Sequence, residues 1–258
     1  MRKIWYSLIS NLRSPKIVTI IGGGGKTSLM YYLLKIVKEQ GEMVIATTTT
    51  KLCSQQMSGH SFVQVQSLSA ACQVVKRVRE KEEAITLVYG EDHHFPGKIV
   101  GIPQEWIDEL GIQYPGTLFV VEGDGSAGKS LKGHLGYEPV IPSKSSLVII
   151  VIGIDSIGVE INSQHVHRPE RICELVGAES KSLVTTDLIT QLLFHPQGYL
   201  HHCSPDQLII PFINKVESVS QQQKAKELAQ KILANKHPQI GGIMIGSVMK
   251  EEGLWLQA

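Results

Sequence analysis

The chain has 258 residues, of which 42% are hydrophobic and 19% charged, and its formal net charge is +1. This composition is that of a globular protein and gives no bulk electrostatic reason to expect binding to nucleic acid or to a membrane surface. No apolar run reaches the ~18 residues of a membrane span, and the N-terminal residues make a poor signal peptide. The four cysteines form no C-x-x-C pair, so we expect reduced thiols and a cytoplasmic location.

Apolar runs rich in isoleucine and valine recur along the chain and alternate with segments of helical periodicity. Strands are predicted at residues 16–21, 42–46, 85–89, 117–121, 147–152, 208–213 and 240–245, with a further short strand at 62–65. Helices are predicted directly after residue 27 and at residues 68–81, 168–176, 186–193 and 221–235. This alternation favours an α/β fold like that of phosphate-loop NTPases, with a doubly wound, mostly parallel sheet and helices on both faces.

No linker or internal repeat divides the chain, so residues 1–258 are predicted to form a single nucleotide-binding domain. Residues 90–103, rich in glycine and proline, indicate a loop or a small hairpin insertion. Residues 125–142 form a long loop without an obvious helix or strand, and loops of this length inside a compact domain are usually functional.

The clearest motif lies between the first strand and the first helix and consists of Gly22, Gly23, Gly24, Gly25, Lys26 and Thr27. Glycine amides at a helix N-terminus bind phosphate, a lysine adds positive charge, and a threonine hydroxyl is a ligand for Mg²⁺. Ile20 stands where the full Walker A pattern has glycine, so the motif is the shorter G-x-x-G-K-T, which resembles the phosphate loop of Mur-ligase-type ATPases. We therefore expect a site for ATP or GTP with Mg²⁺.

Two other interpretations of the glycine motif are less favourable. A plain turn would not need four consecutive glycines, which cost conformational entropy on folding. A dinucleotide-binding turn requires an acidic residue about 20 positions later to hold a ribose. Residues 46–51 read Ala-Thr-Thr-Thr-Thr-Lys and contain no carboxylate, which disfavours NAD.

A second motif is the apolar strand at 117–121 that ends in Glu122 and Asp124. In phosphate-loop enzymes an acid at this position holds Mg²⁺ opposite the threonine of the first motif. We expect Thr27, Glu122 and Asp124 to bind the metal, and Lys26, Glu122 and Asp124 to carry catalysis. The alternative is a turn, because Asp-Gly is a common turn pair.

A third motif, Asn214-Lys215-Val216-Glu217, follows a predicted strand and resembles the N-K-x-D element with which GTPases bind guanine. Glu217 replaces the usual aspartate, so the motif leaves ATP and GTP both open. A plain strand-to-helix turn is the alternative interpretation. Further candidates for contact with a second substrate are Thr49, Thr50, Lys51, Lys132, Asp155 and Arg168, which follow strands or lie in the long loops.

Taken in order, these motifs resemble the YqeC family over nearly the whole chain. The resemblance rests on residues 22–27, 47–51 and 122–126, on Leu131-Lys132 and Glu138-Pro139, and on residues 153–158, 167–170 and 214–217. It implies an accessory protein for selenium-dependent molybdenum hydroxylases, with such a hydroxylase or a selenium-donor system as partner. The residues themselves predict a phosphate-loop NTPase; the alternatives are a nucleotide-gated metallochaperone or scaffold and a Mur-like ligase or kinase acting on a small molecule.

Overall fold

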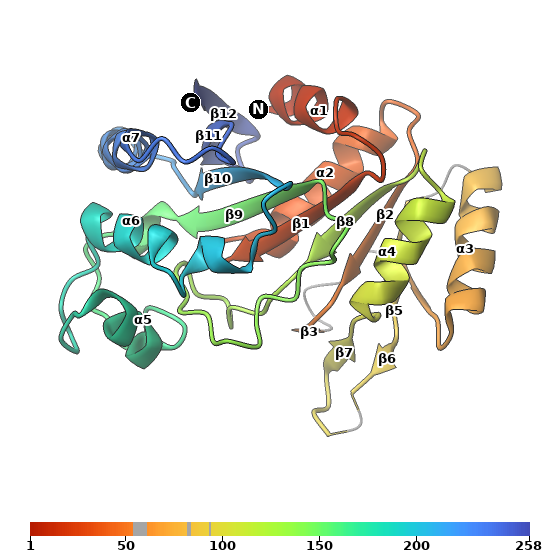
Figure 1. Cartoon of the computed structure of the whole chain (residues 1–258), viewed down its shortest axis with the longest axis horizontal. Coiled ribbons are helices and arrows are strands. Elements are labelled where there is room, and N and C mark those ends of the chain that lie inside the picture. The colour runs from red at the N-terminus through yellow and green to blue at the C-terminus, as the bar shows by residue number, and fades with distance from the viewer. Residues whose placement is uncertain (54–60, 82–83, 93) are drawn as a thin grey trace.

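The structure is a computed structural model that describes residues 1–53, 61–81, 84–92 and 94–258. Nine strands form one sheet in the order β12-β11-β10-β9-β1-β8-β2-β5-β4 (Figure 1). Their bounds are β1 (Ile17–Gly22), β2 (Val44–Thr48), β4 (Phe62–Gln64), β5 (Ile85–Val88), β8 (Leu118–Glu122), β9 (Leu147–Gly153), β10 (Leu208–Asn214), β11 (Gly242–Ser247) and β12 (Glu252–Gln257). Only β12 pairs antiparallel with its neighbour in the described part of this sheet. The predicted α/β class with a large, mostly parallel sheet is confirmed.

Helices cover both faces of the sheet (Figure 1). They are α1 (Arg2–Ser10), α2 (Lys26–Lys38), α3 (Leu68–Lys81), α4 (Gln104–Gln113), α5 (Pro169–Val176), α6 (Thr186–Phe194) and α7 (Val219–Ala234). Alternate residues of β1 face opposite ways: Val18 and Ile20 pack against α1 and α2, whereas Ile17 and Ile21 pack toward the other five helices. Both faces of β1 are buried, which explains its uninterrupted apolar sequence.

Strand β1 lies at the point where the chain changes direction across the sheet. From β1 the chain forms β2, β4 and β5 on one side, returns to form β8 next to β1, and then crosses to β9 on the other side of β1. In open α/β sheets the crevice at such a switch point, at the carboxyl ends of the strands, is where ligands bind. The glycine motif begins at the end of β1 and therefore lies in this crevice.

The long segment between β8 and β9, which contains the predicted loop 125–142, has neither helix nor strand but is packed onto the sheet. Leu131 is fully buried in the core beside Ile21. The hydroxyls of Thr19 and Ser145 lie 2.7 Å apart, and the amide of Val140 donates to the carbonyl of Gly123 at 2.9 Å. The segment takes the place of a crossover helix over β1.

A second, three-stranded sheet has the order β3-β7-β6 and consists of β3 (Lys51–Cys53), β6 (Gly90–Glu91) and β7 (Lys98–Val100). Strands β6 and β7 pair antiparallel within residues 90–103, the segment predicted to be a loop or a small hairpin insertion. A Cβ atom at Gly101 would lie 1.8 Å from the carbonyl oxygen of Thr48, so glycine permits the close approach that holds this sheet against the end of β2.

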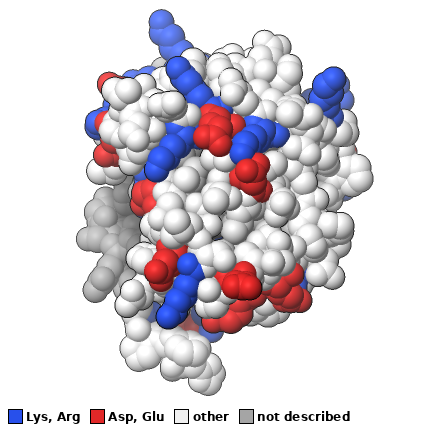
Figure 2. All heavy atoms as spheres, turned by 90° about the vertical axis from the view of Figure 1, so that its left-hand side faces the viewer, with Lys and Arg blue, Asp and Glu red and all other residues white. Residues whose placement is uncertain are grey.

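Most of the predicted strands and helices occur within a few residues of their expected bounds, and β2 extends to Thr48. The elements α1, β3, α4 and β12 were not predicted. Among the described residues, none of the helices combines the length and apolarity that a membrane crossing requires. Figure 2 shows basic and acidic side chains interspersed on the face that carries α5, α6 and α7, where Lys231 pairs with Asp187 at 2.7 Å.

Candidate functional site

The glycine loop between β1 and α2 is pressed against the end of β9. Gly22, Gly24 and Gly25 have φ values of 98°, 92° and 113°, which side chains rarely adopt. A Cβ atom on Gly22 would lie 2.3 Å from the carbonyl oxygen of Val151, and one on Gly24 would lie 2.5 Å from the amide nitrogen of Gly153. The run of glycines is therefore required by backbone conformation and by close contact.

Some backbone amides of this loop donate hydrogen bonds within the protein, and the others are open to the pocket. Gly22 N–H donates to Asp124 Oδ1 at 3.0 Å, and the amides of Gly23 and Gly24 donate to backbone carbonyls at 2.9 Å. These three amides therefore have acceptors within the protein, and phosphate binding by all four glycine amides stays a prediction. The amides of residues 25–28, the N-terminus of α2, donate to no described residue, and Gly25 caps the helix without a side-chain hydrogen bond. Free amides at a helix N-terminus, together with the helix dipole, make a favourable environment for an anion.

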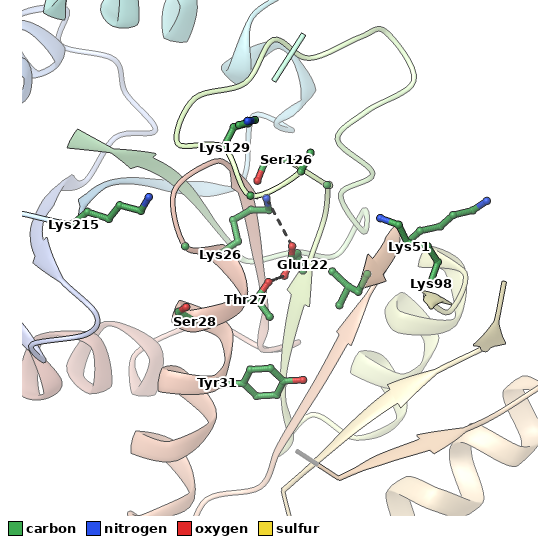
Figure 3. A pocket seen from close by; sticks show the side chains of 15 residues that line it. Lys26, Thr27, Ser28, Tyr31, Lys51, Lys98, Glu122, Ser126, Lys129 and Lys215 are labelled. Carbon is green, nitrogen blue, oxygen red and sulfur yellow. Dashed lines mark hydrogen bonds and ion pairs between the residues drawn. The ribbon is translucent and has the colours of Figure 1, made fainter. Parts of the chain in front are cut away.

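Lys26, Thr27 and Glu122 meet directly beside this helix end. Lys26 Nζ donates to the carbonyl of Gly22 at 2.7 Å and lies 3.7 Å from Glu122 Oε1. Thr27 Oγ1 donates to Glu122 Oε2 at 2.8 Å. All three line a pocket of about 740 Å³, which Figure 3 shows from close by. The first turn of α2 and the end of β8 thus bring together residues that are 95 positions apart in the sequence.

The pocket is rich in lysine. Its lining consists of Gly25, Lys26, Thr27, Ser28, Tyr31, Lys51, Leu52, Lys98, Glu122, Gly125, Ser126, Ala127, Gly128, Lys129 and Lys215. Among these described residues Glu122 is the one that carries a carboxylate. With the open end of α2, this lining favours an anionic ligand.

Beneath the glycine loop lies a buried ionic cluster of Asp124, Lys132, His134 and Glu138, here called the floor network. Asp124 Oδ2 accepts from His134 Nε2 at 2.7 Å and lies 3.2 Å from Lys132 Nζ. Lys132 Nζ also donates to Glu138 Oε2 at 2.8 Å, and Asp124, Lys132 and His134 are completely buried side chains. Through the bond from Asp124 to Gly22 N–H, the network holds the glycine loop in place.

The pKa values of Glu122, the last residue of β8, and of Asp124, two residues beyond it, are shifted in opposite directions. Burial raises the pKa of Glu122, an effect that Lys26 and Thr27 only partly offset. Burial also opposes ionisation of Asp124, but Lys26, His134 and Lys132 outweigh it and hold the pKa of this carboxyl well below its usual range. Burial lowers the pKa of Lys132 to about 8 against the attraction of Asp124, so the ammonium stays mostly charged at pH 7.

His134 completes the network as a neutral ring. Burial lowers its pKa, although its hydrogen bond to Asp124 acts in the opposite direction. The ring proton therefore belongs on Nε2, where it is donated to Asp124, and Nδ1 has no hydrogen-bond partner among the described residues. His134 packs edge-on against Tyr199, whose hydroxyl donates to the carbonyl of Lys132 at 2.7 Å.

The glycine loop, β8 and the floor network lie within a segment that matches a known family. The profile of the family described as YqeC protein matches residues 18–170. The chain belongs to the YqeC family. A relative from Escherichia coli (strain K12), named "Uncharacterized protein YqeC", is 26% identical over 158 residues. This alignment covers 61% of the present chain and 60% of the relative, so the chain spans less than two thirds of that protein's length.

The third motif lies beyond the segment that matches the YqeC family, and the structure separates its members. Asn214 is buried beneath the glycine loop, where it donates to Gly24 O at 2.8 Å and accepts from Val248 N at 3.0 Å. Lys215 lines the pocket and pairs with Asp155 at 2.9 Å. Glu217 does not line the pocket and accepts from Ser247 Oγ at 2.9 Å. The geometry gives Asn214 and Glu217 structural contacts and places Lys215 at the pocket.

The predicted second-substrate residues are also dispersed. Lys51 lines the pocket, whereas Thr49 and Thr50 do not; Thr49 Oγ1 donates to the carbonyl of Val140 at 2.7 Å. Lys132 belongs to the floor network, and Arg168 forms an ion pair with Glu138 on its outer side. Asp155 is not part of the described pocket lining and is linked to it by its ion pair with Lys215.

Sequence analysis did not single out Lys98, Tyr31 or His134. Lys98 follows the β6–β7 turn and has no local motif, so only its place in the small sheet brings it to the pocket. Tyr31 lies one helical turn after Thr27, a spacing that places both on the same face of α2. The predicted metal ligands Thr27 and Glu122 share the pocket, whereas both oxygens of Asp124 are occupied by the floor network and the glycine loop. No group of three or more His, Cys, Asp or Glu side chains with metal-binding geometry occurs in the described part of the chain.

Proposed function

We propose that this YqeC-family protein binds a nucleoside triphosphate, ATP or GTP, with Mg²⁺ and cleaves its terminal phosphoryl bond. The observation that carries the proposal is the open N-terminus of α2, whose amides from Gly25 to Ser28 face a lysine-rich pocket beside Lys26. The oxygens of a phosphate chain would accept hydrogen bonds from these N–H groups and from the Lys26 ammonium. A helix N-terminus with unused amides and an adjacent lysine is an arrangement that binds phosphate in many folds.

The pocket also suits a hard divalent cation. Thr27 offers a hydroxyl and Glu122 a carboxylate, which are oxygen ligands of the kind Mg²⁺ prefers together with water and phosphate oxygens. Burial raises the pKa of Glu122, so a cation that compensates its charge would bind favourably there. When bound, Mg²⁺ would neutralise charge on the phosphate oxygens during transfer.

Lys26, Glu122 and Asp124 would have different roles in the reaction. The Lys26 ammonium would move from its present partners, Gly22 O and Glu122, and bind the terminal phosphates. It can do so because it lies between the helix end and the carboxylate. Glu122 would orient the water or acceptor that attacks the terminal phosphorus, whose bond to the bridging oxygen breaks to release the nucleoside diphosphate. Asp124 acts as a positioning residue, because its contacts go to Gly22 N–H, to the floor network and to Lys26 Nζ at 3.6 Å.

The biological setting we propose is the maturation of selenium-dependent molybdenum hydroxylases, in agreement with the family resemblance. In this role the protein acts in the cytoplasm with a hydroxylase or a selenium-donor system as partner. Two alternative mechanisms use the same pocket. In the first, the protein is a scaffold whose state is controlled by nucleotide binding; in the second, it is a ligase or kinase that acts on a small molecule. Turnover stimulated by a partner protein supports the first, and turnover that depends on a small acceptor supports the second.

The direct test is calorimetric titration of ATP and of GTP in the presence of Mg²⁺, followed by measurement of phosphate release. We expect saturable binding that Lys26→Ala weakens at least tenfold, because each charge-assisted contact contributes about 1.5–3 kcal/mol. Lys226→Ala is the matched control, since this lysine is exposed on α7 away from the pocket. Equal affinity and turnover in wild type and Lys26→Ala would refute the proposal.

A further inference from the structure

The lysines of the pocket form two groups on opposite sides of Glu122. Lys26, Lys129 and Lys215 lie on the side of the glycine loop, and Lys51 and Lys98 lie on the other side (Figure 3). The second group comes from the small three-stranded sheet and is here called the small-sheet lysines. These two lysines have no part in the nucleotide site proposed above.

Strand pairing places the small-sheet lysines on the same face. In the antiparallel β3–β7 pair, Lys51 is opposite Val100 and Cys53 is opposite Lys98. Residues two apart in a strand face the same way, so Lys51 and Lys98 are diagonal neighbours on one face of the pair. Diagonal neighbours lie about 7–8 Å apart, which is within the joint reach of two long side chains. Two like charges so placed repel each other unless an anion lies between or beside them.

The protein itself supplies one anion to this pair. Lys51 Nζ lies 2.5 Å from Asp92 Oδ2 and 4.7 Å from the centre of the Phe95 ring, so its position is fixed from the side of the β6–β7 turn. Lys98 forms no ion pair within the described ranges of the chain. A positive charge without a described partner therefore remains at this side of the pocket.

We infer that Lys51 and Lys98 bind the anionic group of a second small molecule, which occupies the pocket together with the nucleotide. Only the part of this inference that concerns the bound nucleotide rests on the proposed function. A triphosphate is already matched on the other side by the α2 amides, Lys26, Lys129 and Lys215. Leu52 and Tyr31 give the lining an apolar part. The second ligand is accordingly a small molecule with a phosphate or carboxylate group next to an apolar portion.

The test uses the full chain saturated with a non-hydrolysable nucleoside triphosphate analogue and Mg²⁺. Inorganic phosphate and, separately, citrate are titrated by calorimetry into wild type, Lys51→Gln and Lys98→Gln. Comparison of the two probes distinguishes a phosphate-bearing from a carboxylate-bearing ligand. Lys226→Gln, the same change at an exposed position of α7, is the matched control.

We expect saturable binding of at least one probe, weakened at least tenfold in Lys98→Gln and in Lys51→Gln, with nucleotide affinity changed less than about twofold. Two results overturn the inference: failure of both probes to bind the loaded wild type, or an equal loss of nucleotide affinity in the lysine variants, which would make these lysines part of the nucleotide site. Lys98-dependent binding of a probe by a wild-type protein that binds no nucleotide would support the second site and refute the proposed function.

Discussion

The two sides of the glycine loop use charge in opposite ways. On the pocket side, Lys26 and Thr27 contact Glu122 in a space of about 740 Å³ that a ligand can enter. On the other side, Asp124 and Lys132 are completely buried and their charges are met by groups of the protein. Glu122 and Asp124 are two residues apart, yet Glu122 faces the pocket and Asp124 supports the loop.

This difference shows that the environment, more than the residue type, assigns a role to an acid. Desolvation raises the pKa of Glu122 because Lys26 and Thr27 compensate only part of it. Three cationic or donor groups around Asp124 reverse the same desolvation and lower its pKa. A buried carboxylate whose charge is only partly compensated by the protein is suited to binding a cation or a substrate. A buried carboxylate whose charge is fully compensated is suited to a structural role.

The largest effect is expected from Asp124→Asn, which removes the negative charge at the centre of the floor network. Lys132 would stay buried with Glu138 as its remaining anionic partner. Loss of one partner from a buried ionic cluster destabilises by about 3–5 kcal/mol. Urea unfolding should show a lower midpoint at an unchanged slope.

Asp187→Asn provides the matched comparison for this change. Asp187 pairs with Lys231 on the surface, and its side chain is 70% exposed. The same substitution there should cost less than about 1 kcal/mol. Similar losses in the two variants would contradict the distinction between a structural floor and a solvated surface pair.

A smaller loss is expected from Gly24→Ala, which tests how tightly the floor side holds the loop. The new Cβ atom would lie 2.5 Å from the backbone of Gly153, at a φ of 92°. Overpacking costs about 1–3 kcal/mol and a left-handed non-glycine residue about 1–2 kcal/mol. Gly128→Ala, with a φ of 75° and open space around the Cβ atom, isolates the second cost. Thermal or urea unfolding should rank Gly24→Ala as the more damaging change, and equal losses would remove the contact with β9 from the explanation.

The sequence was sufficient to predict the elements that are buried on both faces. The long apolar runs of β1, β9 and β10 have no polar alternation, so their burial in a parallel sheet could be inferred directly. Strand β12 is partly exposed, and α4 buries few of its residues (Ile107, Leu110 and Gly111), so neither has a strong periodic signal. Their formation depends on neighbours that the sequence alone does not identify.

The candidate site was predictable where its residues are adjacent in sequence and unpredictable where the fold brings them together. The motif at residues 22–27 located the helix N-terminus correctly, but it could not show that the carbonyls of Val151 and Lys129 would take two of its amides. Likewise, the spacing of Glu122 and Asp124 was consistent with shared metal binding. The contact of Asp124 with His134, which separates their roles, depends on the packing of the segment between β8 and β9.

A smaller, pH-dependent effect is expected from Glu122→Gln on the pocket side. Because burial raises the folded-state pKa of Glu122, its contribution to stability is complete below the unfolded pKa and is lost as the pH rises through the folded pKa. Glutamine removes this dependence. The free energy of unfolding of the variant should therefore gain on that of wild type as the pH rises above about 4. Urea unfolding across this pH range tests the sign, and a constant difference would contradict it.

The smallest effect is expected from Glu217→Gln, which tests whether the third motif reads a base. Glu217 accepts from Ser247 Oγ and lies outside the pocket lining, so a neutral isostere should leave the ratio of ATP to GTP affinity within about twofold. Lys215→Gln is the informative comparison, because Lys215 lines the pocket and its loss should weaken both nucleotides together. A tenfold change of the ratio in Glu217→Gln would mean that this carboxylate turns toward a bound base and that ligand binding rearranges the end of β10.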